Sequence, residues 1–219
     1  MSDFYKNISD SLKSNIFVKD YIDNLKVSGD NPWELVANLT WKNIGKLKIA
    51  PFELSDLWAL RYWWNESLNY NSKHFFPLFP QGNKLEMAIS NHFKNHSSHR
   101  DVAFNLWLIK EGFINADFDN EIIAHLFLEN FKTHPDIALG ISDKYQGMGF
   151  GKLLLLILIY ITKFSGFQKI YLSVDKENIL GFELYKKMGF RHIGQKEISI
   201  PVSGYKSVVN NMELDLNNY

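Results

Sequence analysis

Cysteine is missing from the 219-residue sequence. Its absence excludes disulfide scaffolds, cysteine-ligated zinc, iron-sulfur clusters and any mechanism that forms a covalent intermediate on a thiolate. Whatever chemistry the protein performs must therefore use other side chains or the main chain.

An excess of charge and a long hydrophobic run are missing as well. Lys plus Arg (24) equals Asp plus Glu (24), so no global field draws the chain to nucleic acid or to an anionic membrane. The longest apolar run, Leu153 to Ile161, has nine residues, whereas a membrane-spanning helix needs about twenty. The first twenty residues contain no apolar stretch typical of a secretory signal. We therefore predict a cytoplasmic protein with no membrane partner and no nucleic-acid partner.

The composition that is present is that of an ordinary folded protein. Hydrophobic residues make up 46% and charged residues 22% of the chain, and the length is that of one domain with a decoration, at about 150 residues per domain. We expect residues 1–45 to form an N-terminal helical extension and residues 46–219 to form the main domain.

Hydrophobic periodicity predicts a mixed α/β sheet in the main domain. The order of elements is β-α-α-β-β-β-α-β-α-β-β, which gives an antiparallel meander followed by a βαβ crossover, with helices on both faces of the sheet. The expected strands are 46–50, 102–109, 121–131, 137–142, 170–174, 190–200 and 207–216. The expected helices are 55–68, 83–96, 149–165 and 179–188.

A glycine-rich turn joins the strand that ends near Ser142 to the helix that begins near Gly149. Unpaired backbone N–H groups and the helix dipole at such a turn suit an anionic phosphate. A Walker A loop would need glycine in place of Gln146, and the dinucleotide fingerprint would need glycine in place of Lys152, so both are excluded. A plain glycine-rich corner without a ligand is the remaining alternative.

Two motifs give the sequence a family resemblance. The turn has the pattern Gln146-x-x-Gly149-x-Gly151, and the next helix has Asn178-x-x-Gly181-x-x-Leu184-Tyr185-x-x-x-Gly189-Phe190. In this order and on these elements, the two motifs resemble the GNAT superfamily of acyl-CoA-dependent N-acyltransferases, over about residues 46–216. The resemblance implies a three-layer GNAT-like fold, acetyl-CoA as the acyl donor, and direct transfer to an amine without a covalent enzyme intermediate.

The resemblance also implies which residues form the donor site. The strand before the turn would hold the pantetheine arm and polarise the thioester through its main chain, the turn would hold the diphosphate, and the asparagine would contact pantetheine. These residues are Leu139, Gly140, Ile141, Gln146, Gly147, Met148, Gly149, Phe150, Gly151, Lys152 and Asn178. Tyr185 matches the general acid that protonates the leaving sulfur, while simple packing of this ring is the alternative.

The general base is left open by the sequence. An acceptor amine must lose a proton, but ordered water can carry it, so no residue type is compulsory. Glu129 and Asp136 are the two candidates that we carry forward, and His134 is a third. A solvated surface role is the alternative for each of them.

The acceptor is expected to be an amine of a small molecule or a peptide. Eight aromatic residues lie between Trp58 and Phe79, and the resemblance implies that this region walls the acceptor pocket, although packing against the sheet explains at least half of the rings. His92, His96 and His99 are spaced for a metal, but their polar surroundings favour a solvated helix end, and we expect no metal.

Two other functions remain compatible with the same residues. One is a module that binds an acyl-CoA and catalyses nothing, and the other is an N-acyltransferase that uses a longer acyl-CoA. The role of residues 1–45 and the oligomeric state, a homodimer included, are left undetermined by the sequence.

Overall fold

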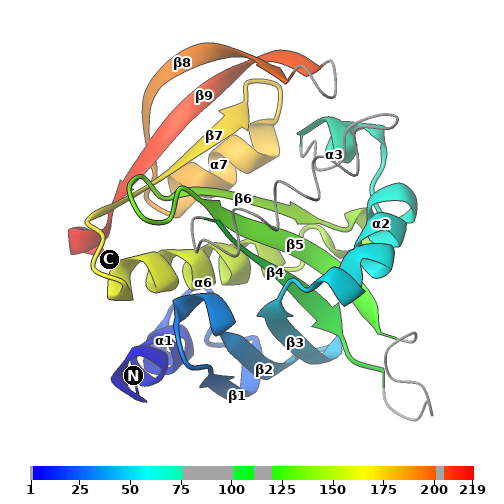
Figure 1. The fold of residues 1–219 in the computed structure, drawn as a ribbon, viewed down its shortest axis with the longest axis vertical. Coiled ribbons are helices and arrows are strands. Elements are labelled where there is room, and N and C mark those ends of the chain that lie inside the picture. Colours follow the sequence, from blue (N-terminus) through cyan, green and yellow to red (C-terminus); the bar gives the residue numbers. More distant parts are fainter. Residues whose placement is uncertain (1, 76–100, 111–119, 201–204) are drawn as a thin grey trace.

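The computed structural model describes residues 2–75, 101–110, 120–200 and 205–219. Within them, one nine-stranded sheet runs in the order β1-β2-β3-β4-β5-β6-β7-β9-β8 (Figure 1). Every neighbouring pair is antiparallel except β6 and β7, which are parallel. The strands are β1 Ile22–Ser28, β2 Val36–Trp41, β3 Gly45–Pro51, β4 Val102–Leu108, β5 Glu121–Glu129, β6 Asp136–Ile141, β7 Lys169–Asp175, β8 Arg191–Ile200 and β9 Tyr205–Asp215.

Helices lie on both faces of this sheet, as the hydrophobic pattern predicts. The described helices are α1 Ser2–Ser14, α2 Leu57–Glu66, α3 Tyr70–Phe75, α6 Phe150–Phe164 and α7 Ile179–Lys187. The predicted mixed α/β class is confirmed, and so is each strand predicted from residue 46 onward, with bounds shifted by a few residues. The helix predicted at 83–96 lies outside the described residues.

The prediction for residues 1–45 was only half right. A helix does occupy Ser2–Ser14, but β1 and β2 follow it and join the sheet beside β3. The pairing of β1 with β2 shifts between Asp23 and Lys26, where Asn24 has a φ of 53°. The apolar residues of β1 therefore do not alternate regularly with polar ones. A bulge of this kind breaks the period of two on which strand prediction depends.

No helix was predicted between the expected helices 55–68 and 83–96, and α3 corrects this for Tyr70–Phe75. The Asn69 side chain accepts a hydrogen bond from the Ser72 amide at 2.9 Å, which is a helix N-cap. The prolines and glycine that follow in the sequence concealed this cap, because they indicate a loop.

Two hydrophobic cores form on the two faces of the sheet. On one face, α6 is buried along nearly its whole circumference, from Leu153 to Ile161, and α1 packs beside it through Ile8 and Leu12. On the other face, Trp63 of α2 packs with buried side chains of β4 and β5. Full burial of a large aliphatic side chain stabilises the fold by about 1.5–3 kcal/mol, so the α6 face dominates stability. None of the described helices combines the length and apolarity needed to cross a bilayer.

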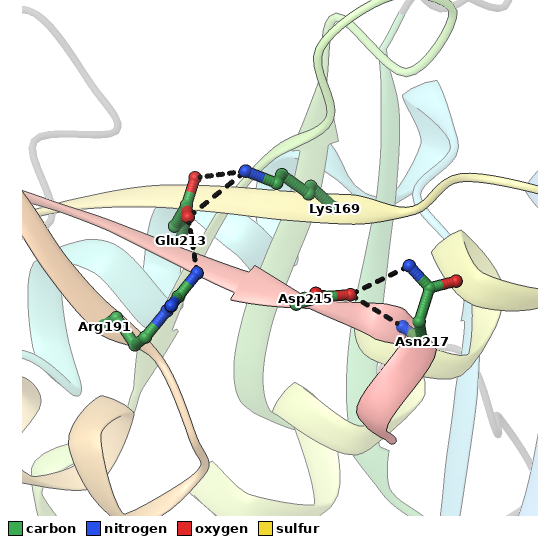
Figure 2. Close-up of polar contacts among 5 residues, drawn as sticks. All are labelled: Lys169, Arg191, Glu213, Asp215 and Asn217. Carbon is green, nitrogen blue, oxygen red and sulfur yellow. Dashed lines mark hydrogen bonds and ion pairs between the residues drawn. The ribbon is translucent and has the colours of Figure 1, made fainter.

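Polar contacts link the last three strands across their surface (Figure 2). The Glu213 carboxylate on β9 lies 3.1 Å from Lys169 Nζ on β7 and 2.9 Å from Arg191 on β8. Asp215 accepts two hydrogen bonds from Asn217, each at 3.0 Å. Exposed ion pairs contribute only about 0–1 kcal/mol each, so the main-chain ladder, rather than these pairs, holds the three strands together.

Candidate functional site

The parallel strands β6 and β7 touch at one end only. The residues directly opposite each other are Asp136 and Tyr171, and the Tyr171 amide donates to the carbonyl of Pro135 at 2.9 Å. Beyond this point the two strands make no further ladder pair in the described residues, so they diverge toward the glycine-rich turn that follows β6. We refer to this opening as the β6–β7 gap.

Alternate residues of β6 direct their main-chain groups into the β6–β7 gap, where the Ile141 carbonyl accepts from the Gln146 side chain. The amide of Ser142, just past the strand, donates to the carbonyl of Ile123 on β5 at 2.8 Å. Hydrogen-bonding direction alternates along an antiparallel pair. Gly140 therefore points its amide toward β5, whereas Leu139 and Ile141 point their N–H and C=O groups into the gap.

The glycine-rich turn displays a run of unpaired amides at the wide end of the gap. Within the described residues, the N–H groups of 147–151 donate to no acceptor, whereas Lys152 and Leu153 already donate to the carbonyl of Gly149. Gly147 and Gly149 have φ values of 77° and 91°, which favour glycine. A methyl group at Gly147 would meet nothing within 4 Å, so the turn is open on that side.

The other two glycines of the turn serve close packing. A methyl group at Gly149 would lie 3.0 Å from Trp41 Cζ2, and one at Gly151 would lie 2.8 Å from Leu184 of α7. Trp41 comes from β2, and its ring also packs at 4.9 Å from that of Phe150. The extension at residues 1–45 thus supports the turn directly through Trp41, a contact that no sequence motif indicates.

The opposite side of the turn is tied to α2 and α3. Asp143 accepts hydrogen bonds from the Asn69 amide and the Ser72 hydroxyl, and Trp63 Nε1 donates to Ser142 Oγ at 2.8 Å. Gln146, predicted as a diphosphate contact, donates its side-chain amide to Asp143 at 3.0 Å and to the Ile141 carbonyl at 3.2 Å. Its side chain therefore shapes the turn, and any ligand contact would be left to its neighbours' amides.

Tyr185 is fixed by the way in which α7 ends. The Phe190 amide donates to the Tyr185 carbonyl, and the Gly189 amide donates to the Lys186 carbonyl, both at 3.0 Å. This is a Schellman motif, with Gly189 at a φ of 90° and with the usual contact between the residues that flank it, here the rings of Tyr185 and Phe190 at 6.0 Å. The motif Tyr185-x-x-x-Gly189-Phe190 thus has a structural cause.

The Tyr185 hydroxyl is available for chemistry. The ring is half-buried against the α6 face of the core, and its hydroxyl makes no hydrogen bond to the described residues. Burial raises the pKa of Tyr185 to about 12, so the phenol stays protonated at neutral pH and can donate. Asn178 caps the other end of α7, accepting from the Gly181 amide at 2.9 Å.

The candidate bases lie together at the narrow end of the β6–β7 gap. Glu129 and Asp136 are directly opposite each other on β5 and β6, and His134 Nδ1 lies 3.1 Å from Asp136 Oδ2. Alternation along β5 places Glu129 on the face of Phe127, which packs in the α2 core. All three groups therefore belong to the α2 face of the sheet.

A buried polar chain on this same face was not expected from the sequence. Asn105 donates to Asp56 at 3.1 Å, and its Oδ1 lies 2.7 Å from Nδ1 of the buried His125, opposite Gly140. Burial raises the pKa of Asp56. Only the alternation of polar residues inside otherwise apolar strands could have signalled this chain.

The aromatic residues of 58–79 do not share one environment. Trp63 is fully buried, whereas Trp58, Tyr62 and Tyr70 are 76%, 69% and 83% exposed. Phe76 and Phe79 lie outside the described residues, as do His92, His96 and His99. The described part of the chain contains no group of three or more His, Asp or Glu side chains that could hold a metal ion.

Known proteins are similar to this chain in the region that contains the glycine-rich turn and α7. The sequence profile of the acetyltransferase (GNAT) family matches residues 83–190. The [ribosomal protein bS18]-alanine N-acetyltransferase of Haemophilus influenzae is 46% identical over 55 residues, which is 25% of this chain and 37% of that protein. The spermine/spermidine N(1)-acetyltransferase of Bacillus subtilis is 35% identical over 60 residues, 27% of this chain and 40% of that protein. The chain thus aligns with less than half the length of these relatives.

Solved structures resemble the fold over most of the chain. The spermidine N-acetyltransferase of Vibrio cholerae, crystallised with CoA and spermine, superposes with a TM-score of 0.59 at 20% identity, over 78% of this chain and 96% of that one. The ribosomal-protein-S5-alanine acetyltransferase of Vibrio fischeri superposes with a TM-score of 0.60 at 10% identity, over 79% and 94%. At such identities the likeness shows a shared fold.

Proposed function

We propose that this chain, whose residues 83–190 match the acetyltransferase (GNAT) family, transfers an acetyl group from acetyl-CoA to an amine by direct attack. The observation that supports this most is the pairing of β6 with β7 at Asp136 and Tyr171 alone. It leaves a gap lined by main-chain groups that begins at five unpaired amides.

Acetyl-CoA would lie along this arrangement. The amides of 147–151 and the N-terminus of α6 suit the diphosphate. The pantetheine arm would run from the turn along β6, in the gap that opens beyond the pairing of Asp136 with Tyr171. Leu139 and Ile141 would hold that arm through their main chains, and Leu139 N–H would polarise the thioester carbonyl. Met148, Phe150, Lys152 and Asn178 complete the proposed donor site.

Tyr185 acts in this proposal as the general acid. The amine nitrogen bonds to the thioester carbonyl carbon, the carbon–sulfur bond breaks, and the sulfur takes the phenol proton. On the reference pKa of a thiol, about 8.5, transfer from a phenol with a pKa of about 12 is uphill. The site must therefore stabilise the phenolate as the proton moves, and proton return from solvent completes the cycle.

The acceptor is proposed to be an amine of a small molecule or a peptide. By their names, the relatives act on a polyamine and on the alanine of a ribosomal protein, and both substrates present an amine. Glu129 and Asp136 lie on the α2 face at the narrow end of the gap, and this position supports them as the candidate bases that the sequence names.

A thiol-release screen with acetyl-CoA tests this function. The panel contains sugars, polyamines, aminoglycosides and peptide N-termini, and the matched variant is Tyr185→Phe. For an amine that passes the screen, we expect Tyr185→Phe to lower kcat by about ten- to hundredfold while the acetyl-CoA dissociation constant changes less than about twofold.

The outcomes separate the proposal from its alternatives. Acetyl-CoA binding without thiol release across the panel would favour a non-catalytic acyl-CoA-binding module. Release that is faster with a longer acyl-CoA would identify a different donor. Unchanged kcat in Tyr185→Phe would leave the phenol a packing role only.

A further inference from the structure

A histidine and a carboxylate form a hydrogen-bonded pair at the narrow end of the β6–β7 gap. Nδ1 of His134 lies 3.1 Å from Oδ2 of Asp136. An ionised carboxylate only accepts, so this contact selects the tautomer with its proton on Nδ1, and in that neutral tautomer Nε2 carries the lone pair. Within the described residues His134 makes no other side-chain hydrogen bond, and its side chain is 55% exposed.

The imidazole ring is held in place from a second direction. It stacks on Tyr171 of β7, with ring centroids 3.7 Å apart and planes inclined by 13°. Tyr171 is the residue of β7 that pairs with Asp136. The ring therefore lies over the pair that joins β6 and β7 in the described structure.

The turn that carries His134 is itself anchored. The amides of Thr133 and His134 donate to the carbonyl of Asn130 at 2.9 and 3.0 Å, and the Asn130 amide donates to the largely buried Asp101 at 3.1 Å. Backbone and ring are thus both fixed, as a group that must meet a reacting atom requires.

The charged groups around this ring lie in one row across the sheet. Cross-strand pairing puts Glu129, Asp136, Tyr171, Glu213 and Arg191 on the same face. Glu213 is paired with Lys169 and Arg191, as Figure 2 shows, and Lys132 lies in the same turn as His134. Asp136 is thus the carboxylate that holds the ring, with Glu129 beside it.

We propose that Nε2 of His134 takes, through ordered water, the proton that leaves the acceptor amine, and that Asp136 is its positioning residue. This inference rests on the proposed function. As the nitrogen–carbon bond forms, the nitrogen loses a proton to Nε2, while the departing sulfur gains one from Tyr185. In model peptides imidazole is a stronger base than a carboxylate by about two to three pKa units, which favours His134 over Asp136 for this step.

The test compares pH profiles of kcat/KM for wild type, His134→Gln, Asp136→Asn and, as a matched control, His192→Gln. His192 lies on β8 next to Phe182, on the opposite face. With an amine that passes the thiol-release screen, we expect His134→Gln to lower kcat/KM by about ten- to thousandfold near pH 7. The deficit should shrink toward pH 10, where hydroxide replaces the lost base.

Asp136→Asn should show a smaller loss, because the ring remains, and His192→Gln should follow the wild type. Acetyl-CoA affinity and melting temperature of His134→Gln should match the wild type, which separates a role in proton transfer from a role in folding. A deficit that is constant with pH, or no deficit, in an active enzyme would overturn the role of His134 alone. A wild type that acetylates no amine would overturn both proposals.

Discussion

Two glycine residues at the two ends of α6 have the same backbone conformation in different surroundings. Gly149 and Gly166 both have a φ of 91°. A methyl group at Gly149 would lie 3.0 Å from Trp41, whereas one at Gly166 would meet nothing within 4 Å. Alanine at Gly166 would therefore test backbone strain alone, whereas alanine at Gly149 would test strain together with the contact to Trp41.

We predict that alanine at either position lowers the free energy of unfolding by about 1–2 kcal/mol, because a left-handed conformation costs that much without glycine. Gly149→Ala should lose more, since Trp41 must move. It should also weaken acetyl-CoA binding at least about tenfold, because a shift of the main chain away from Trp41 would move the amides of the turn, while Gly166→Ala binds normally. Denaturant unfolding and calorimetric titration measure the two effects, and equal affinities would exclude the turn as the diphosphate site.

At the scale of elements, the helices that could be predicted are those whose sequence signals lie within the helix itself or directly beside it. The apolar circumference of α6 and the glycine after α7 both lie within their own segments, and both helices are where the pattern places them. The α3 helix, β1 and β2 were missed, and the signals of α3 and β1 are weak. One depends on a single asparagine cap, and the other is interrupted by a bulge.

The hydrogen bonds between α3 and the glycine-rich turn can be tested by mutation. Asp143 accepts from the Asn69 amide and the Ser72 hydroxyl, and α3 has only six residues, too few to be stable alone. We predict that Asp143→Ala speeds hydrogen exchange of the α3 amides at least about tenfold. Asp215→Ala, which removes a similar cap from the short turn at Leu216–Asn218, should leave α3 unchanged. Equal protection of α3 in wild type and Asp143→Ala would contradict the tie.

At the scale of the whole molecule, the parts of the site that sequence could not predict join segments far apart in the chain. Trp41 meets Gly149, and Trp63 reaches Ser142. A motif identifies a turn or a cap, but not the side chain that packs on it from another strand. The same limit explains why Asp136 was predicted as a base while its bond to His134 and the stacking on Tyr171 were not.

Burial of tyrosine phenols gives the folded molecule a pH limit on its alkaline side. Burial raises the pKa of Tyr5, Tyr185 and Tyr219 to about 12, whereas a tyrosine in the unfolded chain ionises near 10. Between about pH 10 and 12 the unfolded chain has lost protons that the folded protein keeps. Unfolding is therefore favoured as pH rises through this window, by at most about 1.4 kcal/mol per pH unit for each group.

Tyr219 allows a direct test, because its hydroxyl is buried and has no hydrogen-bond partner among the described residues. Tyr219→Phe should be as stable as wild type or slightly more stable at pH 7, since an unpaired buried hydroxyl is removed. Its free energy of unfolding in urea should then fall less steeply than that of wild type above pH 10. Tyr62→Phe, which changes an exposed ring on α2, is the matched control and should keep the wild-type slope. Parallel curves for wild type and Tyr219→Phe through pH 11 would show that this phenol ionises alike in both states.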